Sequence, residues 1–181
     1  MYKTLIDKLY ALAALLGQLI GALKEEKIIP PLVPAPSTVT IVRSPGRILY
    51  EMAVMCLGKD MAPTEDEYGC MEAVNEVCFK ALGDYAGGGT STYRAIPAIS
   101  SNKKFSTVTS PLPGDIIIYP TGYGNGNIPN GHAAIVGENN KVMSNGSQSK
   151  LWEQNYTLET MRERYEGIGG FPRYLFRRVM K

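Results

Sequence analysis

The chain has 181 residues, 44% of them hydrophobic, and its 19 basic side chains nearly balance 17 acidic ones, giving a net charge of +2. This length accommodates one domain with a substantial core plus an appendage, and it excludes two ordinary domains. The balanced charge provides no field for binding phosphate groups, so we expect no nucleic-acid partner.

The cysteine and histidine content argues against a metal site. The chain has 3 cysteines and 1 histidine, and the cysteines, at 56, 70 and 78, show no CxxC spacing. These residues are too few and too widely spaced for a zinc site, so we expect neither a metal nor another cofactor. Cys56, with the periodicity of a helix around it, is expected to be a core thiol.

Residues 1–27 form a segment of their own. Leucines recur with alternating spacings of 4 and 3 residues, which is the a/d pattern of a heptad repeat: Leu5, Leu9, Leu12, Leu16, Leu19 and Leu23. The pattern predicts a leucine-rich helix that either folds onto the domain or self-associates. Residues 9–23 carry no charge, so a signal-peptide core or a short membrane anchor is a further alternative, although such a helix would span only about 22 Å of a roughly 30 Å hydrocarbon layer. Membrane contact is left open.

A proline-rich stretch separates this segment from the rest of the chain. Residues 28–38 include four prolines and no apolar periodicity, which favours extended polyproline II structure. We therefore assign 28–39 to a linker and 40–181 to the working domain.

Two helices are predicted at the start of this domain. Ser44 and Pro45 are typical of a helix N-cap and first turn, and apolar residues then recur at helical spacing as far as Gly58. A second helix is predicted over 70–82, ended by Gly83, with an apolar inner face that includes Cys70 at its N-terminal end.

The remainder of the domain is predicted to be mainly strands. A flexible segment at 85–93 is followed by short apolar runs between turn residues, at 115–119, 132–137, 141–145 and 174–179. A short helix is expected from Thr157. Helices followed by antiparallel strands predict an α+β fold in which the N-terminal helices pack on the sheet.

The one histidine, His132, begins a predicted strand. If 138–141 form the turn of a hairpin, Ala134 lies opposite Asn145, and Asn145 becomes the diagonal neighbour of His132 on the same face. An asparagine carbonyl could then hold the imidazole. A register that differs by one residue would instead turn a neighbour of Asn145 toward the ring.

Cys70 has the position of an activated nucleophile. The free N–H groups and the dipole at a helix N-terminus lower the pKa of a cysteine there and could also supply an oxyanion hole. Its helix is expected to pack on the sheet that carries His132. Cys70, His132 and Asn145 are therefore the candidate nucleophile, base and orienting residue.

Four segments resemble the NlpC/P60 and CHAP group of papain-like cysteine hydrolases. They are YGCMEAVNEV at 68–77, PGDIIIY at 113–119, GHAAIV at 131–136 and VMSNGS at 142–147. Their order matches that group over about 110 residues, from 60 to 170. The small-polar Ser-Gly that often follows the cysteine in NlpC/P60 sequences is absent here, which leaves the subfamily and the bond that is cut open.

The resemblance implies a papain-like fold and hydrolysis of a peptidoglycan amide through a thioester, by an N-acetylmuramoyl-L-alanine amidase or a peptide endopeptidase. It implies that Cys70 attacks, His132 transfers the proton and Asn145 orients the ring. The expected context is a phage lysin or virion-associated enzyme, with a secreted bacterial enzyme as the alternative. Two other functions stay open: a non-enzymatic phage structural or wall-binding module with the same fold, and a cysteine peptidase or acyltransferase with another substrate.

Three aromatic residues are candidates for the substrate-binding surface. Tyr123 lies in the glycine-rich loop 122–131, which could form a lid beside His132, and Trp152 could stack on sugar or peptide. Tyr68, two residues before Cys70, could shape the oxyanion site. The alternatives are that Tyr68 packs against the start of the helix and that Trp152 closes the core.

Overall fold

The protein was analysed as a computed structural model, which describes residues 12–18, 43–64 and 69–179. The chain divides into two units, Met1–Ile41 and Val42–Lys181. Within the described residues, no helix is both long and apolar enough to cross a membrane.

In the first unit, residues 12–18 are helical. Leu12, Leu15 and Leu16 are 56–66% exposed within this single chain. The rest of the predicted helix at 1–27 and the predicted linker at 28–39 lie outside the described residues, so self-association through this segment stays a prediction.

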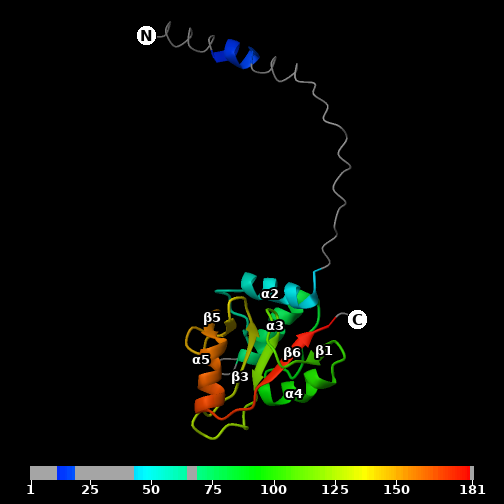
Figure 1. The fold of residues 1–181 in the computed structure, drawn as a ribbon, viewed down its shortest axis with the longest axis vertical. Helices are drawn as coiled ribbons and strands as arrows, with labels where there is room; N and C mark the ends of the chain where they lie inside the picture. The colour runs from blue at the N-terminus through cyan, green and yellow to red at the C-terminus, as the bar shows by residue number, and fades with distance from the viewer. Residues whose placement is uncertain (1–11, 19–42, 65–68, 180–181) are drawn as a thin grey trace. The chain divides into compact units, whose positions relative to one another are not determined.

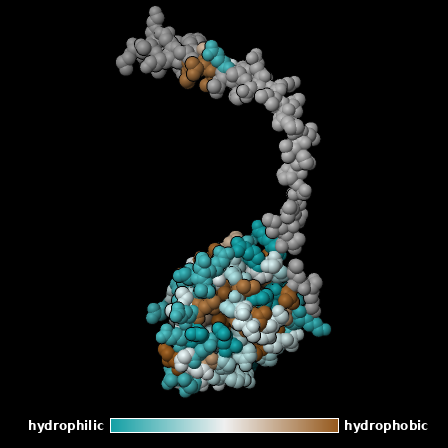
Figure 2. All heavy atoms as spheres, viewed as in Figure 1, coloured by the Kyte–Doolittle hydropathy of each residue, from teal (hydrophilic) through white to brown (hydrophobic). Residues whose placement is uncertain are grey.

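The second unit has an α+β fold in which helices cover both faces of one sheet (Figure 1). Helices α2 (Pro45–Met55), α3 (Cys70–Leu82) and α4 (Thr92–Ser101) pack on one face. Helix α5 (Leu158–Arg162) continues into the π-helix η1 (Glu163–Ile168), and both pack on the opposite face. Figure 2 shows that polar side chains cover much of the visible face of this unit, with apolar side chains in smaller groups.

The sheet has six strands in the order β1-β6-β2-β3-β4-β5, and every neighbouring pair is antiparallel. The strands are β1 (Phe105–Thr107), β2 (Ile116–Tyr119), β3 (His132–Val136), β4 (Lys141–Asn145), β5 (Trp152–Thr157) and β6 (Tyr174–Arg178). Strand β3 therefore lies near the middle of the sheet, between β2 and β4.

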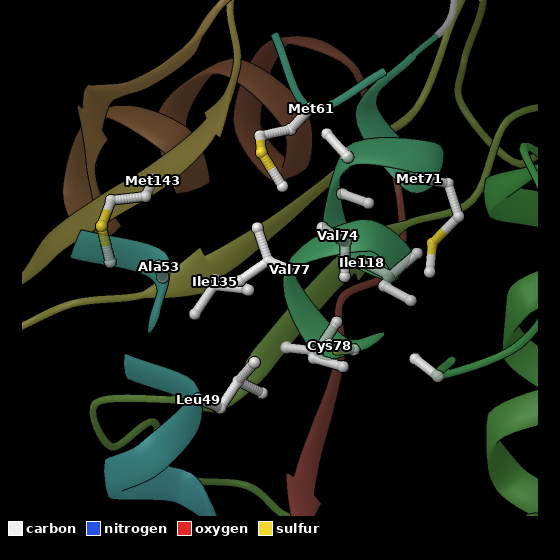
Figure 3. Packing of buried hydrophobic residues seen from close by; sticks show 14 of the residues in the cluster. Leu49, Ala53, Met61, Met71, Val74, Val77, Cys78, Ile118, Ile135 and Met143 are labelled. Atoms are coloured by element: carbon white, nitrogen blue, oxygen red, sulfur yellow. The ribbon is translucent and has the colours of Figure 1, made fainter. Parts of the chain in front are cut away.

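Because side chains alternate along a strand, the sheet has two apolar clusters, one on each face. Ala133 and Ile135 of β3 join the cluster beneath α2 and α3, part of which Figure 3 shows around Val74 and Val77. Ala134 belongs to the other cluster, with residues of α5 and η1. His132, two residues before Ala134, consequently lies on the α5–η1 side of the sheet.

The strongest local signals were predicted correctly. Helix α3 runs from Cys70 to Leu82, and Gly83 ends it in the left-handed conformation at φ +74°. Helix α2 has Ser44 as its N-cap, and the four predicted strands are present. Helix α4, strand β1 and strand β5 were not predicted. Pro97 conceals α4, the mostly polar sequence conceals β5, and β1 has only 3 residues.

The predicted register of the β3–β4 hairpin is wrong by one residue. Ile135 pairs with Met143, and the Gly137 amide donates to the Lys141 carbonyl at 2.7 Å, so the connection is a three-residue loop, 138–140. Asn139 and Asn140 both have positive φ, 53° and 59°, which asparagine tolerates better than most residues. A shift of one residue exchanges the two faces of β4 relative to β3.

Candidate active site

Cys70 is the first residue of α3 and is partly exposed, whereas Cys56 and Cys78 are buried in the core. The N-cap of α3 is Gly69, which has no side chain to occupy the free amides of the first turn. The amides of Met71 and Cys70 itself hydrogen-bond the sulfur and act to lower the pKa of the thiol.

The same sulfur contacts strand β3. The backbone amide of Ala133 hydrogen-bonds the Cys70 thiol, so the nucleophile lies against the residue that follows His132. Gly131, before the histidine, allows this strand end to pack closely, because a Cβ there would lie 1.9 Å from the Tyr119 carbonyl oxygen. Any other residue at 131 would displace the start of β3.

A relay of hydrogen bonds fixes the imidazole. His132 Nε2 lies 2.8 Å from Ser144 Oγ, and this hydroxyl donates its proton to Asn155 Oδ1 at 2.7 Å. Since the Ser144 proton is engaged with Asn155, Oγ accepts from Nε2–H. In the neutral ring this tautomer leaves Nδ1 unprotonated and able to accept a proton.

Tyrosines from η1 and β5 surround the ring. Tyr165 stacks on His132 with a centroid distance of 5.4 Å and an interplanar angle of 2°, and Tyr156 meets it edge-on at 5.7 Å. The tyrosine contacts fix the orientation of the ring plane, and the hydrogen bond to Ser144 fixes the direction in which Nε2 points.

Both reactive groups are neutral in the free protein at neutral pH. Burial, followed by the charge of Arg164, lowers the pKa of His132 to about 4. Burial raises the pKa of the Cys70 thiol and outweighs the amide hydrogen bonds. The site therefore holds a neutral thiol and a neutral imidazole rather than a preformed thiolate–imidazolium pair.

Cys70, His132 and Asn145 line one cleft of about 220 Å³. Arg164 and Tyr165 of η1 form part of its wall. The structure thus brings the three predicted catalytic residues to the same cavity, with a cationic side chain beside them.

The predicted role of Asn145 is wrong in this geometry. Because the hairpin register differs by one residue, Ser144 rather than Asn145 shares the face of His132 and binds its ring. Asn145 is only 9% exposed, and its Oδ1 is buried without a hydrogen-bond partner among the described residues. It lines the cleft without orienting the base.

The three predicted substrate-binding aromatics have different positions. Trp152 is fully buried and donates Nε1–H to the Ala53 carbonyl at 2.9 Å, so it closes the core. Tyr123 is 54% exposed, stacks on Tyr93 and does not line the 220 Å³ cleft. Tyr68 lies outside the described residues.

Sequence reasoning missed Ser144, Asn155, Arg164 and the two tyrosines beside the ring. Ser144 follows from the alternative hairpin register, which the same sequence allows. Asn155 required recognition of β5, whose exposed polar positions obscure the strand pattern. Arg164 and Tyr165 lie on the helix expected after Thr157, but no local signal relates them to His132.

Within the described residues, no group of three or more His, Cys, Asp or Glu side chains is arranged to hold a metal ion. A comparison with protein-family models finds no model that matches the chain, and a comparison with curated proteins finds no similar sequence.

Proposed function

We propose that this protein is a papain-like cysteine hydrolase that cuts an amide bond of peptidoglycan, as an N-acetylmuramoyl-L-alanine amidase or a peptide endopeptidase. One observation carries the proposal: a cysteine at a helix N-terminus and a histidine whose Nε2 is held by Ser144 open onto one cleft. The resemblance of the motifs around Cys70 and His132 to NlpC/P60 and CHAP enzymes supplies the substrate class.

In the proposed reaction, Cys70 Sγ attacks the amide carbonyl while the thiol proton passes to His132 Nδ1. The developing oxyanion is stabilised by first-turn amides of α3. His132 then delivers the proton to the leaving amine, which leaves a thioester on Cys70. Water, deprotonated by His132, hydrolyses the thioester and releases a carboxylic acid and the free thiol. Ser144 and Asn155 hold the ring and stabilise the imidazolium during both steps.

The neutral thiol and imidazole favour one competing function, a wall-binding module without catalysis. A thiol whose pKa is raised by burial is less reactive than a thiolate. In the hydrolase proposal, by contrast, the proton moves only when substrate occupies the cleft and the carbonyl is within reach of sulfur.

The experiment is incubation of purified peptidoglycan with the full chain, followed by mass spectrometry of the soluble products. The hydrolase proposal predicts new amine and carboxylate ends, and a loss of roughly 10³-fold or more in rate for Cys70→Ser. Cys56→Ala, which changes a core thiol away from the cleft, is the matched control and should retain activity. Circular dichroism verifies that each variant is folded.

Three results are informative. Wall binding without new ends, unaffected by Cys70→Ser, would establish the binding module instead. Cleavage of protein or acyl substrates but not of peptidoglycan would assign a peptidase or acyltransferase.

For the cellular context we propose a phage lysin or virion-associated enzyme, with a secreted bacterial enzyme as the alternative. Lysis of intact cells by protein added from outside would support this context.

A further inference from the structure

A second cleft adjoins the first at Cys70. It has a volume of about 290 Å³ and shares Cys70, Asn130 and Gly131 with the first. The nucleophile therefore lies where two cavities meet, so the two sides of a scissile bond would enter different surroundings.

Among the residues that the structure describes, the lining of the second cleft has no charged side chain and is rich in hydroxyl groups. Its remaining lining residues are Thr90, Ser91, Thr92 and Thr121. The chain directly after Thr92 and Thr121 leads to Tyr93 and Tyr123, which are 55% and 54% exposed and stack on each other at 5.9 Å. Hydroxyl-bearing lining residues, followed within two positions along the chain by exposed aromatic residues, suit a neutral ligand that carries hydroxyls and apolar C–H faces, such as a sugar.

The first cleft has a different character because of Arg164. Arg164 is exposed, and among the described residues that line this cleft it is the only one with a charged side chain at neutral pH. Its guanidinium lies 5.7 Å from the Tyr165 ring centroid, and no carboxylate among the described residues pairs with it. A planar guanidinium supported by an aromatic ring is suited to bind a carboxylate.

We propose that Cys70 separates a carboxylate-binding peptide subsite at Arg164 from a neutral sugar subsite lined by Thr90, Ser91, Thr92 and Thr121, so that the bond cut joins the sugar to the peptide. This inference rests on the proposed function and narrows it to the amidase. An endopeptidase would have peptide rather than sugar on both sides of the bond, and the described lining of the hydroxyl-lined cleft provides no cation for a peptide carboxylate.

In this arrangement Cys70 attacks the lactyl carbonyl of the muramoyl group, and the amine of the first peptide residue leaves with the proton carried by His132. The acyl part stays in the hydroxyl-lined cleft as the thioester until water releases it. Carboxylates of the departing peptide bind Arg164 on the other side.

The test uses the full chain and three soluble substrates: a disaccharide–tetrapeptide, the same molecule with its peptide carboxylates amidated, and the tetrapeptide without sugar. The wild-type protein should release intact tetrapeptide from the first and should not cut the third. Arg164→Gln should raise KM for the carboxylate substrate by roughly tenfold to a hundredfold and leave KM for the amidated substrate nearly unchanged. Because the charge of Arg164 also lowers the pKa of His132, its loss should change kcat for both substrates alike. Arg162→Gln removes the same charge on a residue that lies outside both clefts and should have no effect.

The sugar subsite is tested with Tyr123→Ala, which should raise KM for both sugar-containing substrates by roughly threefold to tenfold. Tyr85→Ala is the control, since Tyr85 is also exposed and stacked, on Phe79, but no residue within two positions of it lines either cleft. Cleavage within the peptide, or equal effects of Arg164→Gln on KM for the carboxylate and amidated substrates, would overturn the inference and leave the hydrolase proposal standing. Failure to cut any peptidoglycan substrate would instead refute the proposed function.

Discussion

Replacing Ser144 by alanine should weaken His132 as a base while leaving the imidazole in place. The change deletes the oxygen that accepts from His132 Nε2 at 2.8 Å at a position with no solvent exposure, so the imidazole loses its fixed tautomer. A buried N–H left without a partner costs about 1–3 kcal/mol, and we expect the free energy of unfolding to fall by that amount.

The effect on catalysis follows from the charge that the ring acquires. A hydrogen bond from a charged donor contributes about 1.5–3 kcal/mol, against about 0.5–1.5 for a neutral one. Ser144 therefore stabilises the imidazolium by about 1–1.5 kcal/mol more than the neutral ring, which corresponds to roughly tenfold in rate. Loss of the tautomer adds to this, so we expect kcat to fall by roughly tenfold to a hundredfold.

The assay combines peptidoglycan hydrolysis with nitrogen-15 NMR of the imidazole. The chain has 1 histidine, so its signals need no further assignment. The wild-type ring should be protonated at Nε2, and Ser144→Ala should give a mixture of tautomers. In Asn145→Ala the tautomer should be unchanged, because Asn145 Oδ1 has no hydrogen-bond partner to lose within the described part of the chain. The reasoning is refuted if Asn145→Ala changes the tautomer and Ser144→Ala does not.

Three other changes test the electrostatics and the core. The pKa of His132 is about 4 in the folded protein, below the roughly 6.5 of an unfolded chain, so the unfolded state binds more protons between these two pH values. The free energy of unfolding should therefore be highest above pH 6.5 and fall by up to about 3 kcal/mol as the pH drops toward 4. Denaturation of His132→Gln over the same pH range should not show this loss. Trp152→Phe leaves the Ala53 carbonyl without its donor and should lower the free energy of unfolding by about 1–3 kcal/mol with KM unchanged. A rise in KM without a loss of stability would instead show that Trp152 contacts the substrate. Asp115→Asn weakens two hydrogen bonds from Arg177, at 2.9 and 2.8 Å, to a carboxylate that is 1% exposed. A thermal melt should show that the free energy of unfolding falls by roughly 1.5–3 kcal/mol. An unchanged melt would mean that this ion pair does not contribute to stability.

The sequence was sufficient for the elements whose signals are local. The apolar periodicity and terminal glycine of α3 placed Cys70 at a helix N-terminus, and the short apolar run after Gly131 placed His132 at a strand start. The partner of His132 could not be fixed in this way, because it depends on whether the hairpin loop has two or three residues. Both loops fit a Glu-Asn-Asn sequence, and the choice between them decides which side chain of β4 faces the ring.

Contacts between distant segments were also beyond local patterns. Tyr165 belongs to a π-helix, whose wider turn changes the direction of side chains relative to an α-helix. The stacking of Tyr165 on His132 joins residues far apart in the sequence. Only the packing of η1 on the sheet brings them together.

The two reactive groups, Cys70 and His132, are packed by helices on opposite sides of the sheet. The Cys70 helix packs with the cluster under α2 and α3, whereas the His132 ring rests on Tyr165 in the layer formed by α5 and η1. The two groups can consequently be tuned separately: substitutions in the tyrosine layer change the basicity of the imidazole without repacking the thiol, and substitutions behind α3 do the reverse. Such a division allows a protein of this kind to adapt to a more acidic or more alkaline surrounding through changes on one side alone.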